Sequence, residues 1–413
     1  MLSKPFDQIT AADIQDLCAR GASENQLLEF KRELPAERGH LDPWPNGGNP
    51  TAYAQDRLFR EIVAFANAQG GTLIVGVEET KDKPPRAAAI QTLPRIHDLA
   101  ARIEDSARAR IEPLIPGLQI RGIETGGTGD GVLIVRTSAS PFGPHRVASH
   151  GHAFIRRGPS SVQMTMREIQ DLTLDLARGV DRLDAIFRER AEGFSKWLQR
   201  ASGEIAACRI TAAPLGNFPG LTRLSGDPNA VPVKTRFRGS IGTSEVDLIG
   251  PSLGGIRPIV RGIRRYEPND ESARIDIFES GLIDLWYRHQ PVQVGYHFFV
   301  GWVLAAYLSV LDSIDRTRMM AEFPDWEFAI EFALDGLTGA PRHGGGRVPL
   351  AALSLGGFND IHSSAKIGEL PIGFPRIPYR SRQDREAIIN TVLNDLIDAA
   401  GDPRNAEPLK LLT

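Results

Sequence analysis

Residues 56–79, DRLFREIVAFANAQGGTLIVGVEE, constrain the fold more than any other stretch of the chain. A helix is predicted over 56–68, because the apolar residues recur on one helical face. They are Leu58, Ile62, Phe65 and Ala66. Gln69-Gly70-Gly71 stops this helix and turns the chain into TLIVGVEE, a short apolar run typical of a buried strand. A helix that leads directly into a buried strand predicts a sheet covered by helices.

The same pattern continues through the first 180 residues. Further helices are predicted at 10–20, 96–111 and around 164–178, and strands at 23–31, 118–124, 132–137 and 152–158. Residues 34–50, rich in Pro, Gly and Asn, predict a mobile loop. The fold class expected for this part is α/β (α+β), with a mixed sheet flanked by helices.

The remainder of the chain has a different texture. A connecting helix is predicted over 181–202, followed by a separate mixed α/β domain over 203–413. Within that domain we expect irregular strands from 203 to 286, a buried helix at 296–316, a strand at 326–334 and a terminal helix at 383–400. The first domain is expected to span 1–180.

Composition narrows the class of protein. The 413 residues carry 48 Lys and Arg against 51 Asp and Glu, a net charge of −3, so nucleic-acid binding would have to come from a local patch. Two distant cysteines argue against a disulfide scaffold or a zinc site. The most apolar run, 296–311, is shorter than the roughly 20 residues that span a bilayer, and the N-terminus does not resemble a signal peptide. We therefore expect no membrane association and a cytoplasmic location.

The stretch SENQLLEFK, residues 23–31, carries the strongest chemical signal. Alternate residues of a strand face the same way, so Glu29 and Lys31 would project together while Phe30 packs inward. A carboxylate that binds Mg²⁺ or Mn²⁺ beside a lysine that neutralises phosphate charge suits a phosphodiesterase. The same triplet is common on solvated strands. Glu78 and Glu79 end the next predicted strand and could supply further ligands.

A second group of candidates is basic. His145 and Arg146, together with Arg156 and Arg157 on the predicted strand FIRRG, could bind nucleic-acid phosphates by charge. An ion pair of Arg157 with Glu168 is the alternative. The glycine-rich stretches lack the lysine of a phosphate-binding loop, which disfavours ATP hydrolysis.

Three blocks in this order, SENQLLEFK, AFANAQGGTLIVGVEE and SPFGPHRV…HAFIRRGPSSVQMTMREI, resemble the Schlafen-type AlbA-like domain over roughly residues 10–178. In nuclease members of that family, three acids form a metal site that cleaves structured RNA, tRNA especially. The family motif E-x4-E-F-K is matched by Glu24, Glu29, Phe30 and Lys31. Glu79 matches the third acid, where aspartate is usual, and Glu78 is the alternative in register.

The resemblance implies two functions that stay open at this point. One is a Mg²⁺- or Mn²⁺-dependent endoribonuclease acting on tRNA-like RNA, with Glu24, Glu29 and Glu79 as metal ligands and Lys31 on the phosphate. A bacterial phage-defence or stress effector is the biological role that this function would suit. The other is a DNA-binding transcriptional regulator that cuts nothing, with a sensing C-terminal domain. Animal members grip RNA between two related lobes. Because this chain has one recognisable lobe, a homodimer or larger homo-oligomer is expected.

Overall fold

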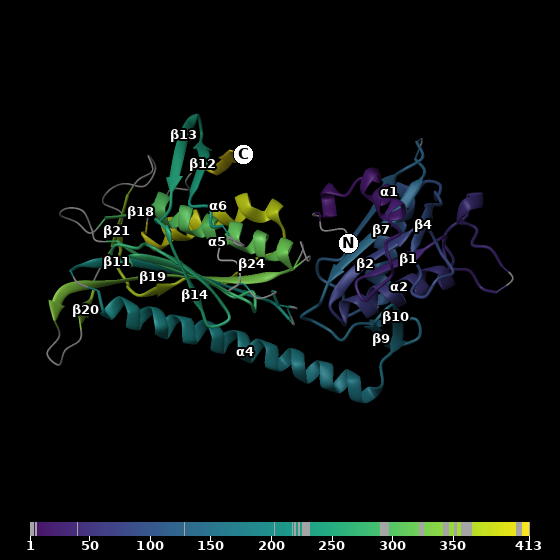
Figure 1. Ribbon diagram of the computed structural model, residues 1–413, viewed down its shortest axis with the longest axis horizontal. Helices are drawn as coiled ribbons and strands as arrows, with labels where there is room; N and C mark the ends of the chain where they lie inside the picture. Colours follow the sequence, from purple (N-terminus) through teal and green to yellow (C-terminus); the bar gives the residue numbers. More distant parts are fainter. Residues whose placement is uncertain are drawn as a thin grey trace. The chain divides into compact units, whose positions relative to one another are not determined.

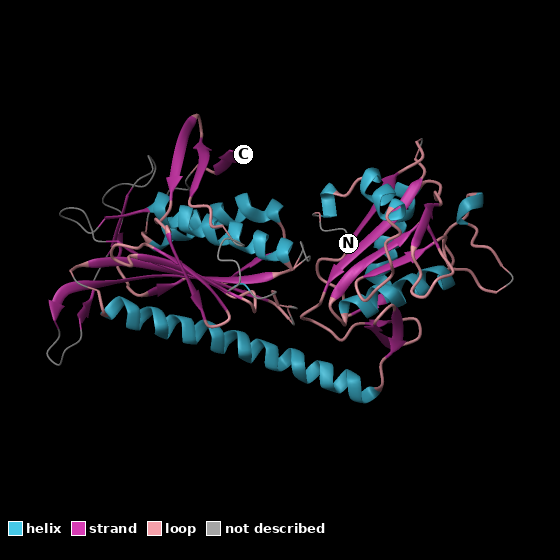
Figure 2. Ribbon diagram, in the orientation of Figure 1, coloured by secondary structure: helices cyan, strands magenta, loops and turns pink. Residues whose placement is uncertain are grey.

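The structure is a computed structural model that describes residues 4, 6–38, 40–127, 129–201, 203–216, 218, 220–221, 224, 232–289, 297–321, 326–341, 347–350, 353–356, 366–401 and 407–412. It divides into two compact units, one formed chiefly by Met1–Asp181 and one by Arg182–Ala321 with Glu327–Thr413. Both units combine helices and strands, which confirms the α+β class (Figures 1 and 2). Among the described residues, no helix combines the length and apolarity needed to cross a membrane.

The N-terminal unit is built on a four-stranded sheet with strand order β1-β2-β7-β6. The strands are β1 (Leu28–Lys31), β2 (Gly70–Val75), β7 (Gly131–Ser138) and β6 (Gln119–Glu124). β1 and β2 run parallel, and the other neighbours are antiparallel. The unit also contains a two-stranded sheet and a second four-stranded sheet. β3 (Val77–Glu79) pairs with β4 (Ala87–Ile90), and a second sheet has the order β10-β9-β8-β5. Its strands are β10 (Ser160–Gln163), β9 (His152–Arg157), β8 (Arg146–Val147) and β5 (Ile111–Glu112).

Helices cover both faces of the four-stranded sheet. On one face Phe30, Ile74 and Ile134 pack with α1 (Ala11–Ala19), which the short 3₁₀ helix η1 (Phe6–Gln8) precedes. On the other face Leu73 and Val135 pack with α2 (Ala52–Ala66) and α3 (Ile96–Arg110). Every residue of β2 from Thr72 to Val75 is buried, as a strand between two helical layers requires.

The segment predicted as a mobile loop is anchored to the unit. It contains the 3₁₀ helix η2 (Trp44–Asn46). Trp44 is fully buried, and the Arg95 guanidinium lies 3.9 Å from its ring centroid. Asp42 accepts the Trp44 amide at 2.9 Å and the Thr51 amide at 3.0 Å. A buried indole and a capping carboxylate therefore fix a stretch whose composition alone indicates freedom.

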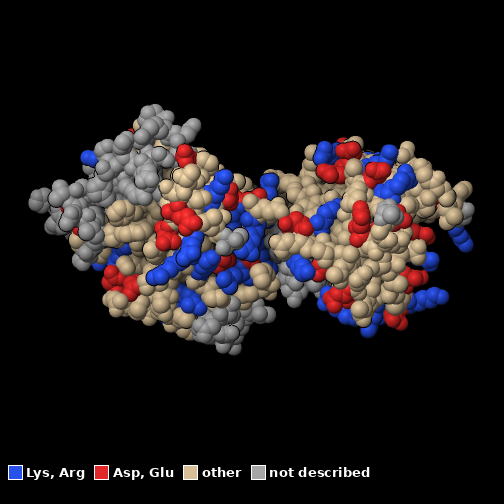
Figure 3. All heavy atoms as spheres, turned by 90° about the horizontal axis from the view of Figure 1, so that it is seen from above, with Lys and Arg blue, Asp and Glu red and all other residues tan. Residues whose placement is uncertain are grey.

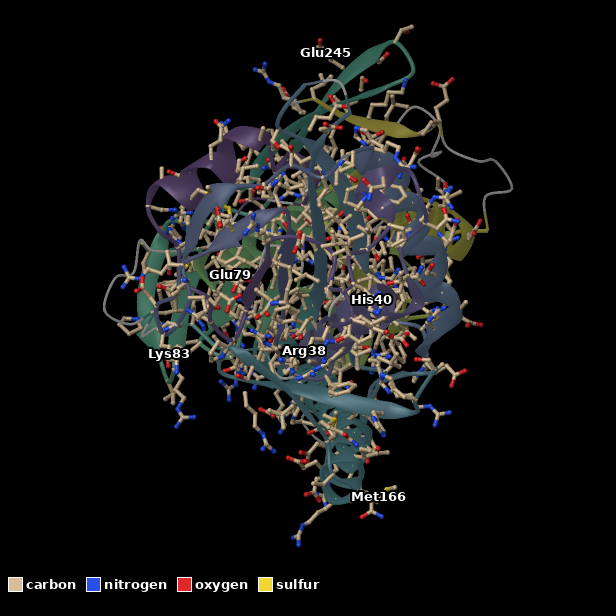
Figure 4. All side chains as sticks on the ribbon, turned by 90° about the vertical axis from the view of Figure 1, so that its right-hand side faces the viewer. Arg38, His40, Glu79, Lys83, Met166 and Glu245 are labelled. Atoms are coloured by element: carbon tan, nitrogen blue, oxygen red, sulfur yellow. The ribbon has the colours of Figure 1, made fainter. Side chains whose placement is uncertain are left out.

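α4 (Met166–Gln199) is one continuous helix, where the sequence predicted a helix closing the first domain and a separate connecting helix. Gly179, at the expected break, stays helical, and nothing lies within 4 Å of the position that a Cβ would take there. The division between the two units falls inside α4. Its first residue, Met166, is exposed and is labelled in Figure 4.

The C-terminal unit contains a large sheet with strand order β14-β15-β16-β17-β11-β19-β20, to which β23 and β24 add by pairing with β19. The described residues of the region predicted to hold irregular strands, 203–286, form regular antiparallel strands, and the rest of that region lies outside the described residues. The strands are β11 (Ile205–Pro214), β14 (Gly255–Ile259), β15 (Gly262–Tyr266), β16 (Ala273–Phe278), β17 (Ile283–His289), β19 (Phe328–Pro341), β20 (Arg347–Pro349), β23 (Ile372–Gly373) and β24 (Ile377–Tyr379).

Two smaller sheets and two helices complete this unit. The first sheet joins β13 (Ser244–Ile249), β12 (Arg236–Ile241) and β25 (Leu409–Leu412), and the second joins β18 (His297–Phe299), β21 (Leu353–Gly356) and β22 (Lys366–Ile367). The buried helix α5 (Val300–Met320) begins later than predicted, since 297–299 are in a strand, and Tyr296 lies outside the described residues. The 3₁₀ turn η4 (Arg382–Asp384) leads into α6 (Arg385–Ala399), the predicted terminal helix.

Candidate active site

Strand β1 places Glu29 and Lys31 side by side. Phe30 between them is fully buried in the core against α1, and the Lys31 ammonium donates to the Glu29 carboxylate. The same ammonium donates to the Phe30 carbonyl at 2.8 Å. The predicted alternation of this strand is therefore present, but Glu29 is 6% exposed rather than a solvated strand charge.

Glu79 reaches the same place because the chain bends after β2. Gly76 has a φ of 106°, which a side chain rarely tolerates, and its amide donates to the Lys31 carbonyl at 2.7 Å. The bend carries β3 past the end of β1, so that a Glu79 carboxylate oxygen lies 3.8 Å from the Lys31 ammonium. Glu79 is labelled in Figure 4. Glu78 faces elsewhere and pairs with Arg32 at 3.4 Å. Of the two acids left open by the sequence, Glu79 is the one beside Lys31.

Glu24 approaches from the loop before β1. It is 6% exposed, and its carboxylate accepts the Phe30 amide at 2.9 Å. Burial, and next the negative charge of Glu29, raise the pKa of Glu24 to about 7, against a smaller lowering by the Phe30 amide. Glu24, Glu29, Glu79 and Lys31 are called the acidic site below.

The acidic site combines like charges with a single ammonium. Burial raises the pKa of Glu79, and the charge of Glu29 adds to this while Lys31 opposes it. Burial by itself would lower the pKa of Lys31, but the carboxylates of Glu29, Glu79 and Glu24 outweigh it and raise that pKa. Lys31 is therefore charged at neutral pH, whereas Glu24 exchanges its proton close to neutrality.

Arg156 lies behind the acidic site and holds it in place. Its side chain is completely buried, and its guanidinium donates to Glu29 at 3.0 Å, to Glu61 on α2 at 3.1 Å and to the Asn25 carbonyl at 2.9 Å. The guanidinium also lies 4.6 Å from the Phe65 ring centroid. The sequence assigned Arg156 to a phosphate-binding surface, and this burial corrects that assignment. Arg156 instead ties the loop, β1 and α2 together.

His145 is also an interior residue. It has no exposed surface, and its ring Nδ1 lies 2.7 Å from the Pro113 carbonyl oxygen. Burial lowers its pKa, so the imidazole is neutral at pH 7. Asn67 at the end of α2 accepts the His145 amide at 2.7 Å and donates to the carbonyls of His145 and Phe154. The contribution of His145 is thus to hold the second sheet against α2, in place of the expected contact with phosphate.

Arg146 and Arg157 are exposed, as the sequence predicted, but each pairs with an acid. Arg146 lies 3.0 Å from Glu112, and Arg157 donates to Glu168, the partner named as its alternative. On the face seen in Figure 3, acidic and basic side chains of the N-terminal unit are interspersed. The four basic candidates therefore do not form one continuous patch.

The carboxylates of the acidic site are the candidate ligands of the expected metal ion. Carboxylate oxygens are suitable ligands for Mg²⁺ or Mn²⁺. Among the described residues, however, no group of three or more His, Cys, Asp and Glu side chains is arranged to hold a metal ion. Both carboxylate oxygens of Glu29 contact cationic side chains, one Lys31 and the other Arg156. Carboxylate oxygens are suitable ligands for such an ion, but the carboxylates of the acidic site are not arranged to hold one.

Sequence reasoning missed three residues around Arg156. Glu61 and Ser161 both contact its guanidinium, and the Ser161 hydroxyl donates to Glu61. Asn25 contributes its carbonyl oxygen, in a tight turn where its side chain accepts the Leu27 amide at 2.8 Å. Glu61 is next to Ile62, which lies on the apolar face of the helix predicted from the sequence. A charged residue at that place is ordinarily exposed, so the sequence did not indicate its contact with Arg156, 95 residues away.

The part of the chain that carries the acidic site is similar to known proteins. Residues 24–165 match the family described as Schlafen, AlbA_2. Among solved structures, the DIP2311 protein of Corynebacterium diphtheriae is 25% identical with a TM-score of 0.25, over 37% of this chain and 30% of its own length. The N-terminal domain of a RecG-related protein of Nitrosomonas europaea is 17% identical with a TM-score of 0.25, over 38% of this chain and 95% of its own length. No curated protein gives a significant match. Residues 24–165, about a third of the chain, are thus similar to the Schlafen, AlbA_2 family.

Proposed function

We propose that the N-terminal unit is an endoribonuclease that hydrolyses the phosphodiester backbone of tRNA-like RNA. One observation carries the proposal: three mutually repelling carboxylates and a charged lysine converge from β1, β3 and the loop before β1. Charge clusters of this kind, with shifted pKa values, gather at functional sites.

The chain's own residues have suitable chemistry. The Lys31 ammonium neutralises negative charge that develops on a phosphate oxygen in the transition state. Glu24, with a pKa of about 7, accepts a proton from the attacking hydroxyl or water at neutral pH, where a general base is most effective. Arg156 keeps the Glu29 carboxylate in one position while this occurs.

A divalent cation at Glu24, Glu29 and Glu79 would polarise the phosphate, but these carboxylates would first have to rearrange, because they are not arranged to hold a metal ion here. In the present arrangement Lys31 already pairs with Glu29 and lies 3.8 Å from Glu79. We therefore assign no step to a metal ion, and the cation becomes one arm of the experiment.

The test is incubation of the purified chain with total tRNA and with plasmid DNA, each with Mg²⁺, with Mn²⁺ and with chelator. We expect cleaved tRNA and intact DNA, and loss of cleavage in Glu29→Gln with RNA binding retained. Glu104→Gln is the matched control, because Glu104 is an exposed acid on α3 whose pairing with Arg108 is local to that helix. Intact tRNA under every condition would refute the nuclease proposal.

A second candidate is a DNA-binding regulator that does not cleave. It is favoured by the ion pairs of Glu29 with Lys31 and Arg156, because a carboxylate already neutralised by two cations has less capacity to take part in hydrolysis. This function predicts a shift of duplex DNA in a gel that Glu29→Gln leaves unchanged. The same purified protein decides between the two.

We also propose that the chain acts as a homodimer, which would set two nucleic-acid-binding units on one RNA. Light scattering at micromolar concentration tests this. A mass corresponding to one 45.2 kDa chain would contradict it.

A further inference from the structure

A cavity of about 280 Å³ lies next to the acidic site. One wall is the end of β1 with the residues after it, and the other wall is α2. The first wall is lined by Lys31, Arg32, Glu33 and Pro35, and the second by Arg57, Leu58 and Glu61. Lys31 belongs to both the cavity and the acidic site, and Glu61 connects the cavity to Arg156. A molecule bound at Lys31 therefore has this cavity beside it.

The charges around the cavity favour an anion. Three lining cations, Lys31, Arg32 and Arg57, outnumber two lining acids, Glu33 and Glu61, and the Glu61 carboxylate is already engaged by Arg156 and Ser161. Of these cations, Lys31 and Arg32 are paired with acids outside the cavity, Glu29 and Glu78. Arg57 is exposed and has no ion pair among the residues that the structure describes, and its contact with an aromatic ring is a distant one, 5.9 Å from Tyr53. A free guanidinium at the mouth of a cavity is well suited to bidentate contact with phosphate.

We propose that this cavity binds a backbone phosphate of RNA adjacent to the phosphodiester at Lys31, with Arg57 as its principal contact. The proposal rests on the proposed function, because it takes the acidic site as the place where the backbone lies. The size of the cavity agrees with it. Sites for whole small ligands occupy roughly 300–1,000 Å³, so about 280 Å³ suits one phosphate and its sugar.

The distinguishing variant is Arg57→Ala, and its matched control is Arg102→Ala. Both remove one exposed arginine from a helix of the same unit, but Arg102 is on α3 and does not line the cavity. Loss of one phosphate contact lowers the slope of log affinity against log salt by about 0.7 to 0.9. We expect Arg57→Ala to weaken RNA binding about 5- to 10-fold and to lower that slope, and Arg102→Ala to change neither.

Binding is measured by fluorescence anisotropy of a labelled RNA oligonucleotide at several salt concentrations, in chelator, with the RNA checked on a gel afterwards. A DNA oligonucleotide of the same sequence forms a second arm. Equal effects of the two variants, no effect of Arg57→Ala, stronger binding of DNA than of RNA, or no binding at all would each overturn the proposal. Absence of cleavage with normal Arg57-dependent binding would refute the nuclease function and leave the phosphate site intact.

Discussion

Each unit of the protein buries a group of charges, and the two groups differ in access to solvent. In the C-terminal unit a row of polar residues crosses the large sheet in register: Arg264, Asp276, Asp284, Thr211 and Glu331. Arg264 donates two hydrogen bonds to Asp276, at 2.5 and 2.6 Å, and Thr211 donates to Asp284 at 2.7 Å. In the acidic site, by contrast, Lys31 and Glu79 are 29% and 28% exposed, and Lys31 also lines a cavity.

The comparison teaches that a shifted pKa does not by itself identify a functional site. Burial raises the pKa of Asp284 to about 6, nearly as far as that of Glu24, although Asp284 is completely enclosed. Charge repulsion from Asp276 also raises the pKa of Asp284, so what separates the acidic site is its partial exposure to solvent beside a cavity. We therefore interpret the row as structural and the acidic site as functional.

The largest effect should come from breaking the row. Asp276→Ala leaves the partly buried Arg264 guanidinium without its carboxylate, and we expect the free energy of unfolding of the C-terminal unit to fall by about 3 to 4 kcal/mol. Denaturant unfolding followed by tryptophan fluorescence measures this. Asp247→Ala removes an exposed partner of Arg238 and should cost less than about 0.5 kcal/mol. Equal costs, or loss of RNA cleavage in Asp276→Ala at a temperature where it is folded, would contradict a purely structural row.

Arg156 should be the most sensitive residue behind the acidic site. Arg156→Ala leaves Glu29 and Glu61 without their shared guanidinium, and we expect a loss of about 3 kcal/mol together with loss of cleavage. The neighbouring Arg157, 58% exposed and paired with Glu168, is the control, and Arg157→Ala should cost under about 0.5 kcal/mol. If Arg157→Ala abolishes cleavage while Arg156→Ala does not, the assignment of their roles is reversed.

These two arginines also show what could be predicted from the sequence. Alternation along β1, the turn between α2 and β2 and the order of elements were all accessible, because they depend on neighbouring residues. The position of Arg156 was not, since its partners Asn25 and Glu61 are brought to it by the second sheet packing on α2. Identical residue types one position apart, Arg156 and Arg157, thus have opposite environments that only the register of β9 decides.

The proton equilibrium of Glu24 gives a smaller effect with a defined pH window. Its folded-state pKa of about 7 exceeds the ordinary value of 4.5, so the folded protein binds more protons than the unfolded chain between those pH values. Stability should therefore decline as pH rises from 4.5 to 7, by on the order of 2 kcal/mol. Glu24→Gln should remove this decline and make the protein more stable than wild type at pH 8, by thermal or denaturant unfolding across pH. The wild-type cleavage rate should rise with pH through an apparent pKa near 7, and Glu24→Gln should abolish this pH-dependent cleavage. If the pH profile of cleavage is the same in Glu24→Gln as in wild type, Glu24 is not the general base.

The smallest change in stability is expected at Glu79, where the effect on function should be large. Glu79→Asp withdraws the carboxylate from Lys31 by one methylene at a partly exposed position, so unfolding should change by less than about 0.5 kcal/mol. Cleavage should fall at least about tenfold, because Glu79 helps to position the Lys31 ammonium, and misplacing a reacting group by about 1 Å costs as much as roughly 100-fold. The matched shortening in the row, Glu331→Asp, loosens contacts with Arg209 at 2.6 Å and Arg376 at 3.0 Å and should cost about 1 kcal/mol without altering cleavage. If Glu331→Asp altered cleavage while Glu79→Asp altered only stability, access to solvent would not separate the functional charges from the structural ones.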